Sequence, residues 1–243
     1  MSEKTIVLVT GANRGIGYEV CRQLSKYGCE IILSGRDKTK VELASAELTK
    51  EGGAITPLVL ATSDEASVEA AAAYIEQRFG RLDVLVNNAG GNFDSDQLTT
   101  SVSMAYAQET FELNVLGTWR VTQHMLPLLR KSKHGRIVNV SSGAGAFESD
   151  IAFGLQRMGG MAPAYAVSKA ALTALTVKFA AELKDSGILV NAVCPGWTAT
   201  YPGAETQGAR PVAEGAASIV WGATLADSGP TGGFFRDGKK IAW

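Results

Sequence analysis

Short apolar runs rich in Val and Ile alternate with longer runs of helical periodicity along almost the whole of this 243-residue chain. The first apolar run, residues 5–9 (TIVLV), is typical of a strand that is buried on both faces of a sheet. Strands joined through helices form βαβ units, in which the strands are parallel and the helices cover both faces. We therefore expect strands at 5–9, 30–34, 55–62, 82–88, 136–142 and 188–194, a seventh in the tail 232–243, and helices at 16–27, 38–51, 64–79, 105–133, 164–185 and 212–226.

Local signals place some boundaries within this pattern. Thr62 and Glu65 have the spacing of a capping box that opens the helix 64–79. Pro127 lacks a backbone donor and predicts a bend or an interruption within 105–133. Pro57 fits the strand 55–62 only near its start or at a sheet edge.

The composition is that of a globular protein, with 46% hydrophobic and 19% charged residues. The length suits one large domain, and the sequence contains no linker or repeat. We therefore expect a single doubly wound α/β domain over residues 1–243. The net charge of −1 gives no reason to expect a nucleic acid or an anionic membrane as a partner, and no apolar run approaches the ~18 residues of a membrane span.

The cysteines and histidines narrow the chemistry further. Cys21, Cys29 and Cys194 are odd in number and lack CxxC spacing, which is typical of buried free thiols in a reducing compartment. His124 and His134 are too few and too far apart to predict a metal cluster. The N-terminal residues lack the pattern of a signal peptide, so we expect a cytoplasmic protein without a metal site.

A glycine-rich turn, TGANRGIG (10–17), lies between the first expected strand and the first expected helix. Gly11, Gly15 and Gly17 can adopt turn geometry and let backbone N–H groups approach a pyrophosphate at the helix N-terminus. Tight turns need glycine in any case, but the position within a βαβ unit favours a Rossmann-type dinucleotide site. A P-loop is excluded because no Gly-Lys-Ser/Thr follows.

The end of the second expected strand indicates which dinucleotide is bound. An acidic residue there would accept the 2′-hydroxyl of NAD, and Asp37 has the right distance along the chain but lies beyond the strand end. Arg36 is closer to that end, and Arg14 lies in the glycine-rich turn. Two guanidinium groups near one ribose favour a 2′-phosphate, so we expect NADP(H) unless both arginines are solvated surface charges.

Tyr165 and Lys169 lie four residues apart in PAYAVSKAAL (163–172), so an expected helix brings both side chains to one face. A phenol with a pKa of about 10 is a poor acid or base near neutrality, and an adjacent cation favours the phenolate. The same spacing is also common in surface pairs. The spacing alone is therefore compatible with an active-site pair and with an ordinary surface pair.

Six motifs occur in order: TGANRGIG, NNAG (87–90), FELNVLG (111–117), IVNVSS (137–142), YAVSK (165–169) and PGW (195–197). Together they resemble the short-chain dehydrogenase/reductase family over nearly the whole chain, and most of all its NADPH-dependent carbonyl reductases. The resemblance implies a catalytic tetrad of Asn114, Ser142, Tyr165 and Lys169. Ser142 matches the family position, and Ser141 is the less suitable member of the serine pair.

These residues suit the reduction of a carbonyl group. We expect Tyr165 to protonate the carbonyl oxygen as hydride passes from nicotinamide to the carbonyl carbon, and Ser142 to hydrogen-bond the same oxygen. The resemblance implies that Lys169 binds the nicotinamide ribose and that Asn114 holds a water linking Lys169 to solvent. The expected cofactor contacts are Gly11, Asn13, Arg14, Gly15, Ile16, Gly17, Arg36, Asn88, Ala89, Gly90, Tyr165, Lys169, Pro195, Gly196 and Thr200.

The sequence departs from the family at two places. Ala61 stands where the family commonly has an Asp that contacts adenine, so adenine must be held by apolar or backbone contacts. Ser142 and Tyr165 are 23 positions apart, nearly twice the usual spacing. The insertion, at about 143–162, resembles a longer one in carbonyl reductases that obstructs the family's tetramer contact. A monomer is therefore expected, with a homodimer as the alternative.

Residues 197–212 are rich in Gly, Pro and small polar residues and predict a mobile lid over the substrate. The function that we expect is NADPH-dependent reduction of a ketone, aldehyde or quinone, reversible to the oxidation of a secondary alcohol. The alternatives are an NAD-dependent alcohol dehydrogenase of the same fold and a redox sensor that binds the dinucleotide without turnover. Candidate pocket walls are Phe93, Phe147, Phe153, Trp197 and Tyr201.

Overall fold

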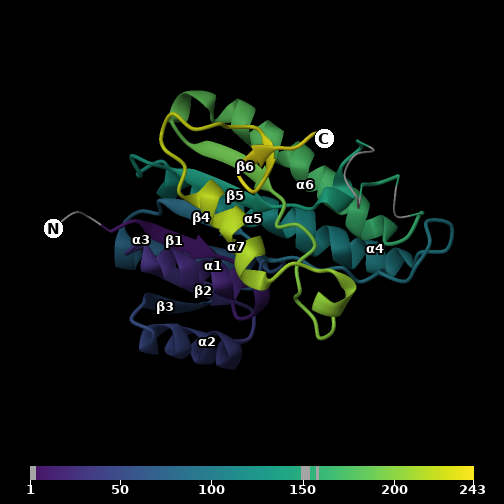
Figure 1. The fold of residues 1–243 in the computed structure, drawn as a ribbon. Coiled ribbons are helices and arrows are strands. Elements are labelled where there is room, and N and C mark those ends of the chain that lie inside the picture. The colour runs from purple at the N-terminus through teal and green to yellow at the C-terminus, as the bar shows by residue number, and fades with distance from the viewer. Residues whose placement is uncertain (1–3, 149–153, 157–158) are drawn as a thin grey trace.

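The computed structural model describes residues 4–148, 154–156 and 159–243, and its centre is one sheet with the strand order β3-β2-β1-β4-β5-β6-β7-β8 (Figure 1). Neighbouring strands from β3 to β7 are parallel, and β8 is antiparallel to β7. The doubly wound parallel sheet predicted from the alternation is confirmed. The strands are β1 (Ile6–Val9), β2 (Glu30–Gly35), β3 (Ala54–Val59), β4 (Val84–Asn87), β5 (Arg136–Val140), β6 (Leu189–Val193), β7 (Phe234–Arg236) and β8 (Lys239–Lys240).

Helices cover both faces of this sheet. In β1, Val7 and Val9 pack into the core on one face, whereas Ile6 and Leu8 pack into the core on the other. This explains why residues 6–9 are apolar throughout, whereas Thr5 before them is exposed. One face carries α1 (Gly15–Lys26), α2 (Lys38–Lys50) and α7 (Val212–Ala223), and the other carries α3 (Glu65–Phe79), α5 (Gly117–Leu129) and α6 (Pro163–Glu182), while α4 (Met104–Phe111) leads into α5.

The strand order places a switch point between β1 and β4. β1 pairs with β2 on one side and with β4 on the other, so the chain winds outwards from β1 in both directions. The connections leaving the carboxyl ends of these two strands diverge, which opens a crevice where ligands of such sheets bind. Most of the expected site residues lie in the segments that follow β1, β4, β5 and β6, and Arg36 follows β2.

Two local predictions were wrong. The helix α3 is capped by Asp64, whose side chain accepts a hydrogen bond from the N–H of Ser67 at 3.2 Å, and not by a capping box from Thr62. Asp64 directly precedes the helix and is itself among the strongest N-cap residues. Pro127 lies within α5 close to its end, and the irregularity occurs earlier, in the π-helical turn η1 (Glu112–Leu116).

The C-terminal tail and the three cysteines are largely as the sequence predicted. The tail does form β7, and a further short strand, β8, turns back against it. Cys21, Cys29 and Cys194 are buried and unpaired, as expected. None of the helices in the described residues has both the length and the apolar character needed to cross a bilayer. Residues 149–153 and 157–158 of the expected insertion, Phe153 among them, lie outside the described residues.

Candidate active site

The glycine-rich turn that follows β1 is pressed against the NNAG turn that follows β4. Gly11 has a φ of 62°, and a Cβ there would lie 2.8 Å from the Cα of Ala89. A Cβ on Gly17 would lie 2.4 Å from Nδ2 of Asn88. That amide donates to the carbonyl oxygens of Thr10 and Gly11 at 2.9 and 3.0 Å, so it joins the two turns.

The turn and the helix after it fit the pyrophosphate of a dinucleotide. Arg14 occupies the N-cap of α1 without capping it through its side chain, and the first turn of α1 contains no acidic residue. The positive end of the helix is therefore open to an anion. Gly15 has a φ of 59°, and a Cβ there would meet only the methyl group of Thr200, at 3.8 Å. Thr200 therefore lies beside the glycine-rich turn, and both were expected from the sequence to contact the cofactor.

Gly17→Ala tests this close approach. The added Cβ would overlap Asn88 Nδ2 and would also lie 2.9 Å from the Cα of Ala12, which is backbone and cannot swing aside. We expect the free energy of unfolding to fall by about 1–3 kcal/mol in urea denaturation. The matched control is Gly80→Asn, because Gly80 has a φ of 72° and open space around it. Asn tolerates this conformation, and an equal loss in the control would contradict the argument.

Tyr165 and Lys169 lie on successive turns of α6, as the spacing predicted. The side chain of Ser142, which follows β5, lies close enough to Tyr165 for hydrogen bonding between them to act on the pKa of the tyrosine. Nζ of Lys169 is 5.7 Å from the centroid of the Tyr165 ring and donates to the carbonyl oxygen of Val140 at 2.8 Å. Ser141 Oγ donates to the backbone carbonyl oxygen of Lys169 at 3.2 Å and is bonded to Thr173 Oγ1 at 2.7 Å, whereas it is Ser142 that lies beside the phenol of Tyr165.

Burial governs the protonation of this pair. Desolvation raises the pKa of Tyr165 above its ordinary value, although the hydrogen bond from Ser142 acts in the opposite direction. Desolvation lowers the pKa of Lys169 to about 8. Burial is therefore the main influence on the pKa of Tyr165, and it acts against the acidic phenol that the neighbouring lysine led us to expect.

Asn114, the fourth residue of the expected tetrad, lies in the π-helical turn η1 and is fully buried. Its Oδ1 accepts from the N–H of Gly91 at 2.8 Å, and its Nδ2 donates to Gly91 O and to Ser168 Oγ, both at 2.9 Å. A Cβ on Gly90 would lie 3.0 Å from Asn114 Oδ1 and 3.4 Å from Lys169 Nζ. Asn114 therefore fixes the NNAG turn beside Lys169, and π-helical turns are frequent at such functional positions.

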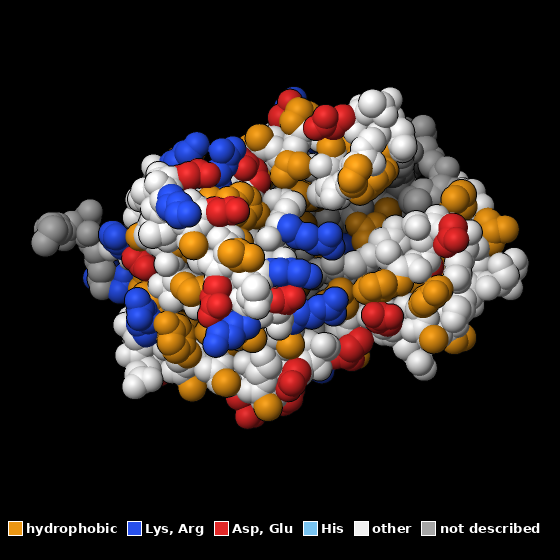
Figure 2. All heavy atoms as spheres, turned by 90° about the horizontal axis from the view of Figure 1, so that it is seen from below, with side chains coloured by type: hydrophobic (Ala, Val, Ile, Leu, Met, Phe, Trp, Pro, Cys, Tyr) orange, Lys and Arg blue, Asp and Glu red, His pale blue; other side chains and the backbone are white. Residues whose placement is uncertain are grey.

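The two arginines and Asp37 differ in what they contact. Arg14 and Arg36 are exposed, and neither guanidinium group has a hydrogen-bond or ion-pair partner among the described residues. Asp37 instead caps α2, accepting from the N–H of Lys40 at 3.1 Å, and this hydrogen bond is the main reason that its pKa is lowered. Basic side chains gather around a hollow on the face shown in Figure 2.

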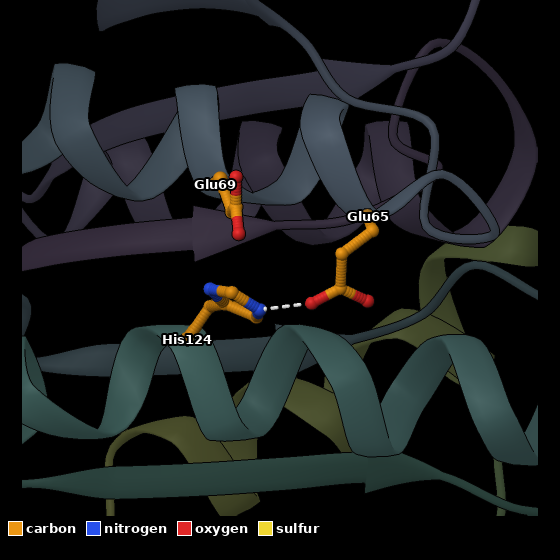
Figure 3. Close-up of side chains that lie close together, drawn as sticks. All are labelled: Glu65, Glu69 and His124. Atoms are coloured by element: carbon orange, nitrogen blue, oxygen red, sulfur yellow. Dashed lines mark hydrogen bonds and ion pairs between the residues drawn. The ribbon is translucent and has the colours of Figure 1, made fainter.

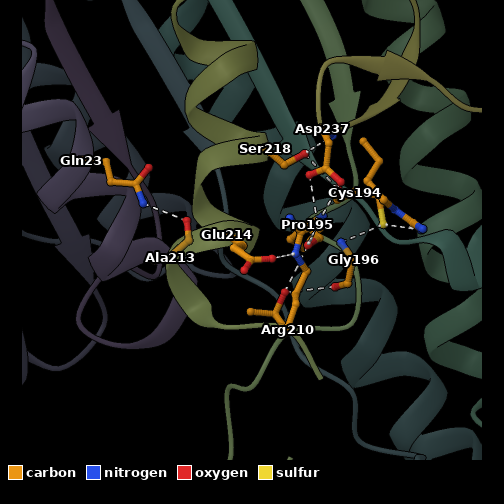
Figure 4. Close-up of polar contacts among 11 residues, drawn as sticks. Gln23, Cys194, Pro195, Gly196, Arg210, Ala213, Glu214, Ser218 and Asp237 are labelled. Atoms are coloured by element: carbon orange, nitrogen blue, oxygen red, sulfur yellow. Dashed lines mark hydrogen bonds and ion pairs between the residues drawn. The ribbon is translucent and has the colours of Figure 1, made fainter. Parts of the chain in front are cut away.

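The expected lid, residues 197–212, is anchored at one residue. Arg210 donates to both carboxylate oxygens of Asp237 at 2.9 and 3.0 Å, lies 3.4 Å from Glu214, and pairs with Thr198 in a β-bridge (Figure 4). A hollow of about 420 Å³ lies within this segment. It is lined by Ala199, Thr200, Tyr201, Pro202, Gly203, Glu205 and Thr206.

Among the aromatic candidates for pocket walls in the described residues, Tyr201 lines the hollow. Phe147 is 67% exposed, and the hollow's lining does not include Phe93 or Trp197. Two further residues were missed. Thr10 Oγ1 accepts from the N–H groups of Asn88 and Ala89, both at 3.0 Å, and Asp94 contacts the start of α6. The contact partners of both lie far away in the sequence, so no local pattern indicates these roles.

A group of possible metal ligands lies apart from this edge, between α3 and α5. Glu65, Glu69 and His124 place one ligand atom each within 4.8 Å of one another (Figure 3). Glu65, however, is already bonded to His124 at 2.6 Å and to Arg120 at 2.9 Å, and the hydrogen bond from His124 lowers its pKa. An exposed ion-pair group accounts for this arrangement.

Comparisons with known proteins agree with this geometry. The family model described as short chain dehydrogenase matches residues 5–209. The chain is 37% identical over 231 residues to the short-chain dehydrogenase anuI of Penicillium roqueforti, covering 91% of this chain and 89% of that protein. It is 33% identical over 276 residues to the NADPH carbonyl reductase 3 of Mus musculus, covering 98% of each.

Solved structures show the same likeness. The NADPH-bound carbonyl reductase from chicken fatty liver superposes with a TM-score of 0.85 at 27% identity, covering 99% of this chain and all of that one. Salutaridine reductase from Papaver somniferum superposes with a TM-score of 0.81 at 29% identity, covering 96% of this chain and all of that one.

Proposed function

The chain belongs to the short-chain dehydrogenase family of oxidoreductases, and from this premise we propose that it is an NADPH-dependent reductase of a ketone, aldehyde or quinone, reversible to the oxidation of a secondary alcohol. One observation carries the proposal. The side chains of Tyr165 and Ser142 lie close enough for hydrogen bonding between them to act on the pKa of Tyr165, and Nζ of Lys169 is 5.7 Å from the centroid of the Tyr165 ring. Two neighbouring neutral hydroxyl donors suit an oxygen that gains negative charge.

The dinucleotide would be held along the switch-point crevice. The glycine-rich turn and the open N-terminus of α1 suit its pyrophosphate, and the exposed Arg14 and Arg36 suit a 2′-phosphate. When bound, the nicotinamide supplies the hydride. The residues that we assign to it are Gly11, Asn13, Arg14, Gly15, Ile16, Gly17, Arg36, Asn88, Ala89, Gly90, Tyr165, Lys169, Pro195, Gly196 and Thr200.

The residues of the tetrad handle the proton and the charge. Tyr165 donates its hydroxyl proton to the carbonyl oxygen, and Ser142 hydrogen-bonds that oxygen as its charge grows. Lys169, on the next turn of α6, supplies a positive charge that favours the phenolate left behind. Asn114 keeps the NNAG turn and the start of α5 in place beside Lys169.

Adenine must be held without the acidic residue that is common at position 61. The N–H of Ala61 donates to Ser67 Oγ at 3.0 Å and is therefore already used within the turn before α3. Apolar contact with the exposed side of Ala61 is left as the means of holding adenine. This makes the phosphate contacts of Arg14 and Arg36 more important for affinity.

Titration with NADPH and with NADH, followed by tryptophan-to-nicotinamide energy transfer, tests the choice of cofactor. We expect NADPH to bind more tightly, because Asp37 is engaged as a helix cap and Arg14 and Arg36 have no other partner among the described residues. Arg14→Ala and Arg36→Ala should each weaken NADPH about tenfold and leave NADH within about twofold. Arg130→Ala, an exposed arginine at the end of α5, is the matched control.

Preference for NADH would instead support the NAD-dependent alcohol dehydrogenase. A dinucleotide that binds tightly while no carbonyl compound or alcohol is turned over would support a redox sensor. The complete tetrad favours turnover. We also propose a cytoplasmic monomer, with the homodimer as the alternative that light scattering would reveal.

A further inference from the structure

The helix α6, which carries Tyr165 and Lys169, begins without a cap of its own. Its N-cap position is Ala162, which has a left-handed backbone (φ 49°, ψ 48°) and no side-chain acceptor. Pro163 has no N–H, so the first donors of the helix belong to Ala164 and Tyr165. Ala166 already donates to Ala162 O at 3.0 Å. Two buried donors therefore need an acceptor from another part of the chain.

Asp94, in the loop that follows the NNAG turn, supplies both acceptors. Its Oδ2 accepts from the N–H of Ala164 at 2.6 Å, and its Oδ1 accepts from the N–H of Tyr165 at 3.2 Å. Asp94 is 0% exposed. A carboxylate in such a place needs compensating charge and donors, which the positive end of α6 and the two N–H groups provide.

The same loop is fastened to the start of α6 by backbone groups as well. The N–H of Ala162 donates to Gln97 O at 3.1 Å, and the N–H and Oγ1 of Thr99 donate to Gly160 O at 2.9 and 3.0 Å. These bonds do not involve the carboxylate of Asp94. A substitution at Asp94 therefore removes the acceptors of Ala164 and Tyr165 and leaves the loop attached.

We propose that Asp94 is a positioning residue for the reaction assigned above: by holding the first turn of α6, it sets the place of the Tyr165 hydroxyl group relative to Ser142. This inference rests on the proposed function. Asp94 holds Tyr165 at its N–H, and the side chain of Ser142 lies beside its phenol. Lys169 lies one turn further along and has its own bond to Val140 O. Loss of Asp94 should therefore displace the proton donor and leave Lys169 in place.

Kinetics of Asp94→Ala and Asp94→Asn test the proposal. We expect Asp94→Ala to lower kcat by about 10- to 100-fold, because a small misplacement of a reacting group has effects of this size. Asp94→Asn keeps one oxygen as an acceptor and should recover part of this loss. The Kd of NADPH should stay within about threefold in both variants, because the glycine-rich turn and Lys169 are untouched.

The matched control is Asp83, a second buried aspartate that binds a backbone donor. Its Oδ2 accepts from the N–H of Ile6 at 2.8 Å, at the opposite edge of the sheet. Asp83→Ala should lower the melting temperature without lowering kcat at temperatures where the protein is folded. Hydrogen exchange of the peptide that contains Ala164 and Tyr165 should become at least about tenfold faster in Asp94→Ala and stay unchanged in Asp83→Ala.

The outcomes separate the two proposals. If the wild-type protein reduces carbonyl compounds and Asp94→Ala keeps its kcat within twofold, the positioning role is wrong and the proposed function stands. Unchanged hydrogen exchange at Ala164 and Tyr165 in Asp94→Ala would also overturn the positioning role. A wild-type protein that binds NADPH but turns over no carbonyl compound would overturn the proposed function, and the role of Asp94 in that reaction with it.

Discussion

Tyr165→Phe is expected to lower kcat for carbonyl reduction by about 10²- to 10⁴-fold, the range over which a positioned proton donor acts. The substitution removes the hydroxyl group beside Ser142 and leaves the ring in place. The affinity for NADPH should change by less than about threefold, because the turn around Gly11 and the N-terminus of α1 are unaffected. Steady-state kinetics with NADPH and a panel of ketones, aldehydes and quinones measures the first effect, and energy-transfer titration the second.

The matched control is Tyr27→Phe. Tyr27 is 70% exposed and lies at the end of α1, away from the tetrad. It should keep wild-type turnover. If Tyr165→Phe also keeps wild-type turnover, another group delivers the proton and the assignment of the tetrad fails.

Lys169→Met is expected to abolish turnover and, at the same time, to stabilise the protein near neutral pH. Lys169 is 5% exposed, and burial lowers its pKa from 10.5 to about 8. A shift of this size corresponds to roughly 3 kcal/mol against the charged form in the folded state. Met fills a similar volume without the ammonium group, but it leaves Val140 O without its donor, which offsets about 1 kcal/mol of the gain.

The stability that Lys169→Met gains over the wild type should depend on pH. Between pH 8 and 10.5 the unfolded chain still holds the proton on Lys169 while the folded chain has released it, so the stability of the wild type rises with pH across this window. Below pH 8 both states are protonated, and the full penalty remains. The advantage of Lys169→Met in urea denaturation should therefore be largest at pH 7 and should shrink by pH 9.5. An advantage that is equal at both pH values would show that charge burial is not its cause.

Much of the fold could be predicted from the sequence, because burial on both faces leaves a strand with few polar positions. Residues 6–9 are all apolar for that reason, and the glycine-rich turn has a backbone requirement that only glycine meets. Tyr165 and Lys169 were found together because helical periodicity links residues four apart. All of these signals are local in the chain.

The features that were missed depend on contacts between distant segments. Asp94 is 70 residues from Ala164, and nothing near it in the sequence indicates that α6 lacks its own cap. The helix is irregular at the π-helical turn that contains Asn114, whose side chain holds Gly91. The sequence pointed instead to Pro127, because a proline is the stronger local signal for an irregular helix. The capping box at Thr62 failed because the stronger cap, Asp64, was two residues further on.

The segment 197–212, which we expect to act as a lid, has a consequence for how the protein can change by mutation. Its anchor, Arg210, is tied to Asp237 and Thr198, whereas most side chains that line the hollow between residues 199 and 206 are exposed and support little of the core. Mutations there should accumulate with little loss of stability. Residues 199–206 can therefore change during evolution and alter substrate specificity while the catalytic residues stay the same. The capacity to evolve new specificities is concentrated in these few residues.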